Sequence, residues 1–135
     1  MPTIKNLQKE IRLPISKLEK ITKKINKIIG LKKDYCIVIT NDSSIRRLNN
    51  KFLHKNNPTD VIAFDYKENK YLGDIVISCE TAKANAEVFK NTLLKELALY
   101  IIHGILHLKG YDDLKLKDRI LMRKEEARIL NKLFK

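Results

Sequence analysis

The sequence predicts an α+β domain in which a small mixed β-sheet packs with helices around one buried, central helix. Residues 93–108 are apolar on almost every side, which is typical of a helix that is buried rather than amphipathic. Short β-branched runs at residues 35–40, 60–64 and 73–78 indicate strands, and from Glu80 onward the pattern is helical. The resulting order of helix, strand, helix, two strands and three helices is typical of the α+β class.

The N-terminal half is expected to contain two strands and two helices. A short first strand is predicted over residues 3–7, and residues 14–29 carry apolar side chains at helical spacing until Gly30 ends the helix. The lysines on the other face of this helix form either a solvated face or a binding stripe. After the strand at residues 35–40, polar residues cap a helix over residues 44–52.

The C-terminal half is expected to contain a hairpin followed by three helices. A polar loop over residues 53–58 precedes the strands at 60–64 and 73–78, whose connection is too short for a crossover, so they should pair antiparallel. Helices are then predicted over residues 80–89 and 116–134, on either side of the buried helix in sequence.

Composition bounds the kind of protein and its partners. The net charge of +12 exceeds what a domain of 135 residues needs for solubility, which indicates a polyanionic partner. The alternative is that the charge reflects only a biased amino-acid composition, because Lys, Ile and Asn are all abundant. We expect one domain over residues 1–135, because no repeat or low-complexity stretch interrupts the pattern. The sequence shows no signal peptide and no apolar run of membrane-spanning length, so we expect a cytoplasmic protein with no membrane partner. In that compartment Cys36 and Cys79 are expected to be reduced, buried thiols.

A candidate metal site lies at the end of the buried helix. His103 and His107 are four residues apart, so both imidazoles point from one helix face, as a shared metal ion requires. Gly110 ends the helix, and the chain can then fold back so that Asp112 or Asp113 reaches the ion. Two ligands from a helix and one from a loop leave a coordination position open, which favours a catalytic metal. The alternative is a pair of core histidines bonded to backbone.

The residues around the histidines limit the classes of reaction that the site could catalyse. Gly104 stands where a zinc peptidase usually has its glutamate base, which argues against a peptidase, whereas a phosphodiester substrate depends less on such a base. No catalytic side chain is predicted beyond the ligands, and water is the expected attacking group. Glu96 shares the histidine face two turns earlier, where it can orient a histidine from outside the coordination sphere; a solvent-facing carboxylate is the alternative.

Residues 103–113, His-Gly-Ile-Leu-His-Leu-Lys-Gly-Tyr-Asp-Asp, resemble the signature of the YbeY family of metal-dependent endoribonucleases, His-Gly-x-Leu-His-Leu-x-Gly-Tyr-Asp-His. The sequence departs from it at the last position, where Asp113 replaces the third histidine. Further segments that resemble the family are residues 59–64 and 72–78, together with Leu48-Asn49 and Phe52, and Met122 with Glu126. The resemblance thus covers roughly residues 45–130. The family arginine that follows the aromatic residue is Leu53 here.

The resemblance implies a zincin-like metallohydrolase domain that cleaves single-stranded RNA endonucleolytically, in ribosomal RNA maturation and ribosome quality control. Its metal ligands would be His103, His107 and Asp113, holding one divalent ion for which zinc is expected. Basic side chains that would attract RNA are His54, Lys55 and Lys109. Ribosomal RNA and the ribosome are the implied partners. The alternatives are a catalytically weak RNA-binding or ribosome-binding protein with a degraded metal site, and a metallohydrolase with another class of substrate.

Overall fold

The computed structural model describes residues 2–53 and 59–134, and confirms the predicted α+β class. Each predicted strand and helix is present, with ends shifted by a few residues. The elements in chain order are β1 (Thr3–Asn6), α1 (Ile15–Ile29), β2 (Asp34–Thr40), α2 (Asp42–Leu53), β3 (Val61–Phe64), β4 (Tyr71–Ser78), α3 (Cys79–Val88), α4 (Leu93–Leu108) and α5 (Leu116–Leu133).

The sheet is mixed, as predicted, with strand order β1-β2-β4-β3. β1 pairs parallel to β2, and β2 pairs parallel to β4. β3 pairs antiparallel to β4, with Ala63 opposite Ile75, so the predicted hairpin is confirmed. β3 is therefore an edge strand, and it contacts α4.

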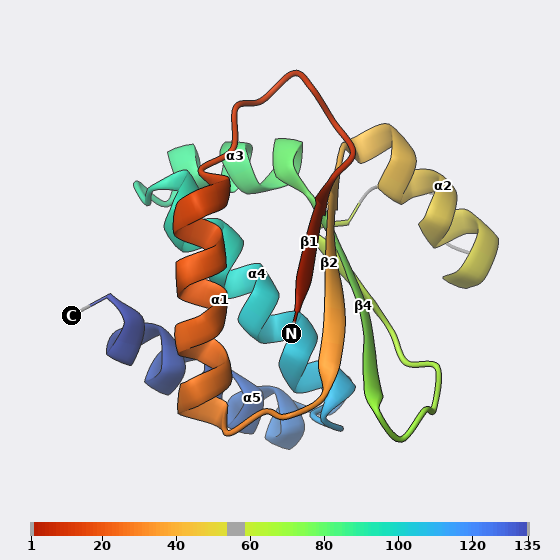
Figure 1. Ribbon diagram of the computed structural model, residues 1–135, viewed down its shortest axis with the longest axis vertical. Coiled ribbons are helices and arrows are strands. Elements are labelled where there is room, and N and C mark those ends of the chain that lie inside the picture. The colour runs from red at the N-terminus through yellow and green to blue at the C-terminus, as the bar shows by residue number, and fades with distance from the viewer. Residues whose placement is uncertain (1, 54–58, 135) are drawn as a thin grey trace.

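Helix α4 lies at the centre of the molecule. It contacts α1, α3, α5, β3 and β4, and Figure 1 shows α1, α3, α4 and α5 on one side of the sheet with α2 on the other. Alternate residues of the central strands, including Ile37, Ile39, Ile75 and Ile77, are fully buried in the main core. A smaller cluster under α2 is centred on Ile45. The expectation of a buried central helix is thus confirmed.

The close approach of α4 to the sheet depends on Gly104. A Cβ atom at this position would lie 2.6 Å from Cγ2 of Ile75 on β4, well inside van der Waals contact. The glycine beside the first histidine therefore makes room for a neighbouring strand. At the end of α4, Lys109 is the capping residue and Gly110 adopts a φ of 104°, which turns the chain back toward the helix.

Surface and thiol features agree with the sequence in the described regions. The lysines on the outer face of α1 are exposed, whereas Cys36 and Cys79 are buried and not joined in a disulfide. Burial raises the pKa of the Cys79 thiol to about 11. Among the helices described, none combines the length and the apolar character that crossing a membrane requires.

Candidate metal centre

His103 and His107 project from one face of α4, as their spacing predicts. Their Nε2 atoms are 3.0 Å apart and their ring centroids 4.6 Å apart. About a quarter of each side chain is exposed, 26% for His103 and 29% for His107, so both rings reach from the core to the surface. These are not core histidines bonded to backbone, because the ring nitrogen contacts that the structure records are to side chains.

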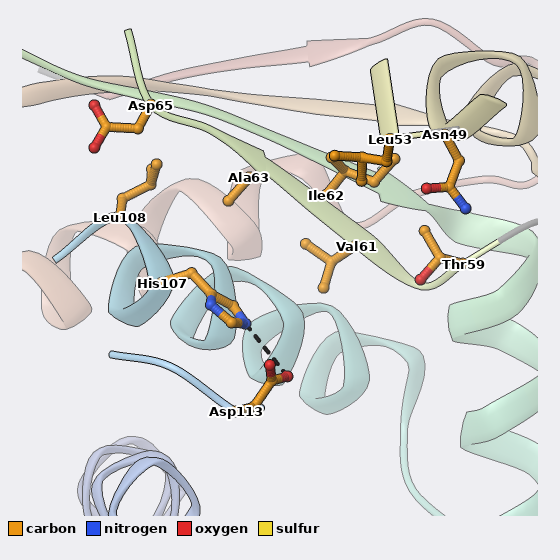
Figure 2. A pocket seen from close by; sticks show the side chains of 10 residues that line it. All are labelled: Asn49, Leu53, Thr59, Val61, Ile62, Ala63, Asp65, His107, Leu108 and Asp113. Atoms are coloured by element: carbon orange, nitrogen blue, oxygen red, sulfur yellow. Dashed lines mark ion pairs between the residues drawn. The ribbon is translucent and has the colours of Figure 1, made fainter. Parts of the chain in front are cut away.

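Asp113 completes a group of three candidate ligands from the connection between α4 and α5. Its Oδ2 lies 3.5 Å from Nε2 of His107 and 3.9 Å from Nε2 of His103, and Figure 2 shows it facing His107 across the mouth of a cleft. Asp112 instead accepts a hydrogen bond from the backbone N–H of Leu114, 3.0 Å away, as expected of a turn residue. Of the two carboxylates that the sequence left open, Asp113 is the one that faces the histidines.

The three side chains fit a divalent metal. Their ligand atoms all lie within 4.8 Å of one another. At zinc–ligand distances of about 2.0–2.2 Å, tetrahedral geometry places neighbouring donor atoms roughly 3.3–3.5 Å apart, which is close to the observed separations of 3.0, 3.5 and 3.9 Å. Two imidazoles and a carboxylate are also a donor set that zinc and other divalent transition metals accept.

Glu126 on α5 orients His103 toward the other two ligands. Its Oε1 lies 2.8 Å from Nδ1 of His103. A carboxylate only accepts, so Nδ1 carries the hydrogen, and the lone pair of Nε2 points toward His107 and Asp113. Burial acts to lower the pKa of His103, but the hydrogen bond and charge of Glu126, with the charges of Asp60 and Asp113, outweigh it and raise the pKa. The same negative surroundings favour a metal cation at Nε2.

The carboxylate that the structure records against His103 is Glu126, and not the predicted Glu96. Glu96 is buried at 3% exposure, so it is not the solvent-facing carboxylate of the alternative interpretation. Its Oε1 accepts a hydrogen bond from Nδ2 of Asn91 at 2.9 Å, in the first turn of α4 and two turns before His103. The metal face of α4 is therefore reached by a carboxylate from the following helix, a contact between residues 23 positions apart. The sequence did not predict this contact, because Glu126 stood out there only as part of a segment that resembles the family.

Replacing Glu126 with alanine is expected to weaken zinc affinity by roughly 10–100-fold, because partners that orient a metal-bound histidine contribute about that much. Zinc affinity would be measured by competition with a chromophoric chelator. Glu125→Ala is the matched control, since Glu125 pairs with Arg128 and not with a histidine. Equal affinities of both variants and the wild type would show that Glu126 does not support the site.

A larger cleft opens on the His107 side of the candidate ligands, with a volume of about 470 Å³. Figure 2 shows its walls, which come from α2, from β3 and the residues next to it, from the end of α4 and from Asp113 in the α4–α5 connection. It is lined by Asn49, Leu53, Thr59, Val61, Ile62, Ala63, Asp65, His107, Leu108 and Asp113. Apolar side chains thus form much of its wall, and no lysine or arginine is among the described residues that line it.

Of the three predicted RNA-binding residues, Lys109 alone belongs to the described part of the chain, and it does not line this cleft. His54 and Lys55 lie outside the described residues. Lys109 is at the exposed end of α4, where it lines a separate shallow hollow with Tyr111 and Asp112. Leu53, which replaces the family arginine, does line the large cleft, so an apolar side chain stands there. The roles of His54, Lys55 and Lys109 in binding RNA stay predictions.

A family model described as Endoribonuclease YbeY matches residues 3–134, almost the whole chain. The chain belongs to the YbeY family. The resemblance predicted from the motifs is therefore confirmed, and it extends beyond residues 45–130 to include β1 and α1.

Individual YbeY proteins are similar to this chain over most of its length. Endoribonuclease YbeY of Pelagibacter ubique is 41% identical over 106 residues, which cover 74% of this chain and 69% of that protein. Endoribonuclease YbeY of Carboxydothermus hydrogenoformans is 32% identical over 139 aligned residues, covering 98% of this chain and 97% of that protein. A Thermotoga maritima protein solved in solution superposes with a TM-score of 0.72 at 29% identity, covering 99% of this chain and 89% of the other. The predicted zincin-like α+β fold is consistent with this YbeY architecture.

Proposed function

We propose that this chain is a metal-dependent, single-strand-specific endoribonuclease that acts in ribosomal RNA maturation and ribosome quality control. Membership of the YbeY family makes it an endoribonuclease, a hydrolase of RNA phosphodiester bonds. The observation that carries the metal dependence is the convergence of His103, His107 and Asp113, whose ligand atoms lie within 4.8 Å of one another beside an open cleft.

The three ligands are proposed to hold one zinc ion. When bound, such an ion polarises a phosphoryl oxygen, lowers the pKa of water and neutralises charge that develops in the transition state. Three protein ligands leave a position open for water or substrate, as a catalytic site requires. An aspartate oxygen is harder than an imidazole nitrogen, so replacing a histidine by Asp113 also favours manganese or iron more than a three-histidine site does.

The protein's own side chains prepare this site in two ways. Glu126 accepts a hydrogen bond from Nδ1 of His103, which fixes the ring so that Nε2 is the nitrogen that faces His107 and Asp113. Val61, Ala63 and Leu108 form an apolar part of the cleft wall beside His107. A flat nucleobase also fits against such a wall, and only an unpaired strand can offer its bases in this way. This supports a preference for single strands.

The cellular setting is proposed from the same family relationship. Ribosomal RNA is the expected substrate and the ribosome the expected partner, in the cytoplasm, for a single metallohydrolase domain spanning residues 1–135. The net charge of +12 supports a polyanionic partner.

Cleavage of matched RNA strands tests this function. The protein, stripped with chelator and reloaded with zinc, is expected to cut a single-stranded RNA and to leave the same strand largely intact once it is annealed to its complement. Manganese and iron would be compared in the same assay. Binding of RNA without cleavage under every metal would contradict the enzyme and favour the binding-protein alternative.

A further inference from the structure

A second, smaller hollow opens on the His103 side of the candidate ligands, with a volume of about 160 Å³. It is lined by His103, Asp113, Arg119, Met122, Arg123 and Glu126. Asp113 borders both this hollow and the large cleft, so the two concave regions meet at the metal centre. A polynucleotide that crosses the metal centre therefore passes from one to the other.

The residues of α5 in this hollow share one helix face. Arg119 lies three and four positions before Met122 and Arg123, and Glu126 lies four and three positions after them, which places these side chains in neighbouring turns on the same side. Met122 is buried and Glu126 contacts His103, so this face is held against α4. The contacts that position Glu126 thus also place Arg119 and Arg123 at the rim of the metal centre.

The guanidinium groups of Arg119 and Arg123 have no recorded partner among the described residues. Both are exposed, and neither guanidinium group forms a hydrogen bond or an ion pair with any other described residue. Arg128 on the same helix differs, because its guanidinium pairs with the carboxylate of Glu125. A free guanidinium beside a metal centre is suited to a phosphate, since its planar fork donates two parallel hydrogen bonds to the oxygens of one phosphate group.

The charge around the ligands supports the same conclusion. The large cleft has the carboxylates of Asp65 and Asp113 and, among its described lining residues, no lysine or arginine. In the small hollow, Arg119 and Arg123 balance the carboxylates of Asp113 and Glu126. A bound divalent ion makes this hollow net positive, so it attracts an anion only once the metal is present.

We propose that Arg119 and Arg123 bind backbone phosphates of RNA next to the bond that is cut, with the adjoining nucleoside in the large cleft. This assignment rests on the proposed nuclease function and supplies the cationic contacts that Leu53 cannot make. The RNA backbone would then lie over the N-terminal half of α5, and the strand would run from the small hollow across the metal centre into the large cleft.

The test compares zinc-loaded wild type, Arg119→Ala, Arg123→Ala and the double variant. Binding of a short fluorescein-labelled DNA strand, which keeps the phosphates, is measured by anisotropy between roughly 50 and 200 mM salt. Each single variant is expected to bind about fivefold more weakly and to lower the slope of log K against log salt by about 0.7, with about twice that change in the double variant. Cleavage of RNA of the same sequence should fall in parallel.

Arg128→Ala is the matched control, with the same loss of charge on the same helix outside the hollow, and should leave the affinity and cleavage close to wild type. Arg123→Lys should restore the salt slope, which counts charges, but not the full cleavage rate, which needs the fork. If the double variant keeps the wild-type slope and affinity while the wild type cuts RNA, this inference is overturned and the nuclease function stands. A wild type that cuts no RNA under any metal overturns the nuclease function instead, and the salt slopes still report on the arginines.

Discussion

Replacing His107 with alanine is expected to abolish metal binding and to lower RNA cleavage by at least about 100-fold. The substitution leaves one imidazole and one carboxylate, too few ligands to hold a catalytic zinc ion firmly. His107 also lines the large cleft together with Asp113, so its loss removes one of the two ligands that border the proposed nucleoside site. Cleavage would be measured under single-turnover conditions with zinc in excess of protein.

The fold should survive this substitution, which separates loss of the site from loss of structure. The side chain of His107 is 29% exposed, and the polar contacts recorded for its ring are to His103 and Asp113, the other two candidate ligands. The thermal unfolding temperature of the metal-free variant should therefore stay within a few degrees of the metal-free wild type. Retention of near wild-type cleavage by a folded His107→Ala protein would exclude His107 as a ligand.

Replacing Gly73 with alanine is expected to destabilise the protein by about 3 kcal/mol or more, and to lower its unfolding temperature by roughly 10 °C. A Cβ atom at Gly73 would lie 2.2 Å from the carbonyl oxygen of Phe64 and 2.9 Å from Cδ2 of Leu108. The backbone φ of 149° is also unfavourable for any side chain. The clash with Phe64 is with backbone of the paired strand, so it can be relieved only by opening the β3–β4 hairpin.

Gly30→Ala provides the comparison for this prediction. Gly30 also has a positive φ, of 74°, but nothing lies within 4 Å of the position that a Cβ atom would take there. Strain alone should therefore cost only about 1–2 kcal/mol at this residue. Both variants would be compared with wild type by urea unfolding. Equal destabilisation would contradict the view that close packing between β3, β4 and the end of α4 makes Gly73 necessary.

Local patterns in the sequence were sufficient to predict the elements and two of the three candidate ligands. The apolar stretch of α4 and the spacing of His103 and His107 depend only on helix periodicity, which the sequence displays directly. The β3–β4 hairpin followed from a short connection between two β-branched runs. The glycine at position 110 predicted a turn that left both Asp112 and Asp113 open as the third ligand, and the resemblance to the family selected Asp113, the one that faces the histidines.

Contacts between distant segments were the part that periodicity could not supply. Glu126 reaches His103 because α5 packs across α4, and the crossing of two helices is set by how their side chains interlock in three dimensions. The same packing brings Arg119 and Arg123 to the metal centre, although in sequence they look like ordinary charges on an amphipathic helix. Glu96 was chosen instead because it shares the helix face with His103, but its first-turn position gives it Asn91 as a partner.

The metal content of the purified protein, measured by elemental mass spectrometry with RNA cleavage assayed on the same samples, tests the proposed centre most directly. Wild type and Asp112→Asn should carry close to one equivalent of metal and cleave single-stranded RNA, because Asp112 caps a turn and Asn keeps its acceptor oxygen. Asp113→Asn, which removes the carboxylate facing both histidines, should lose both properties. Wild-type protein that binds no metal and cuts no RNA, or an Asp113→Asn protein that retains both, would contradict a catalytic metal held by His103, His107 and Asp113.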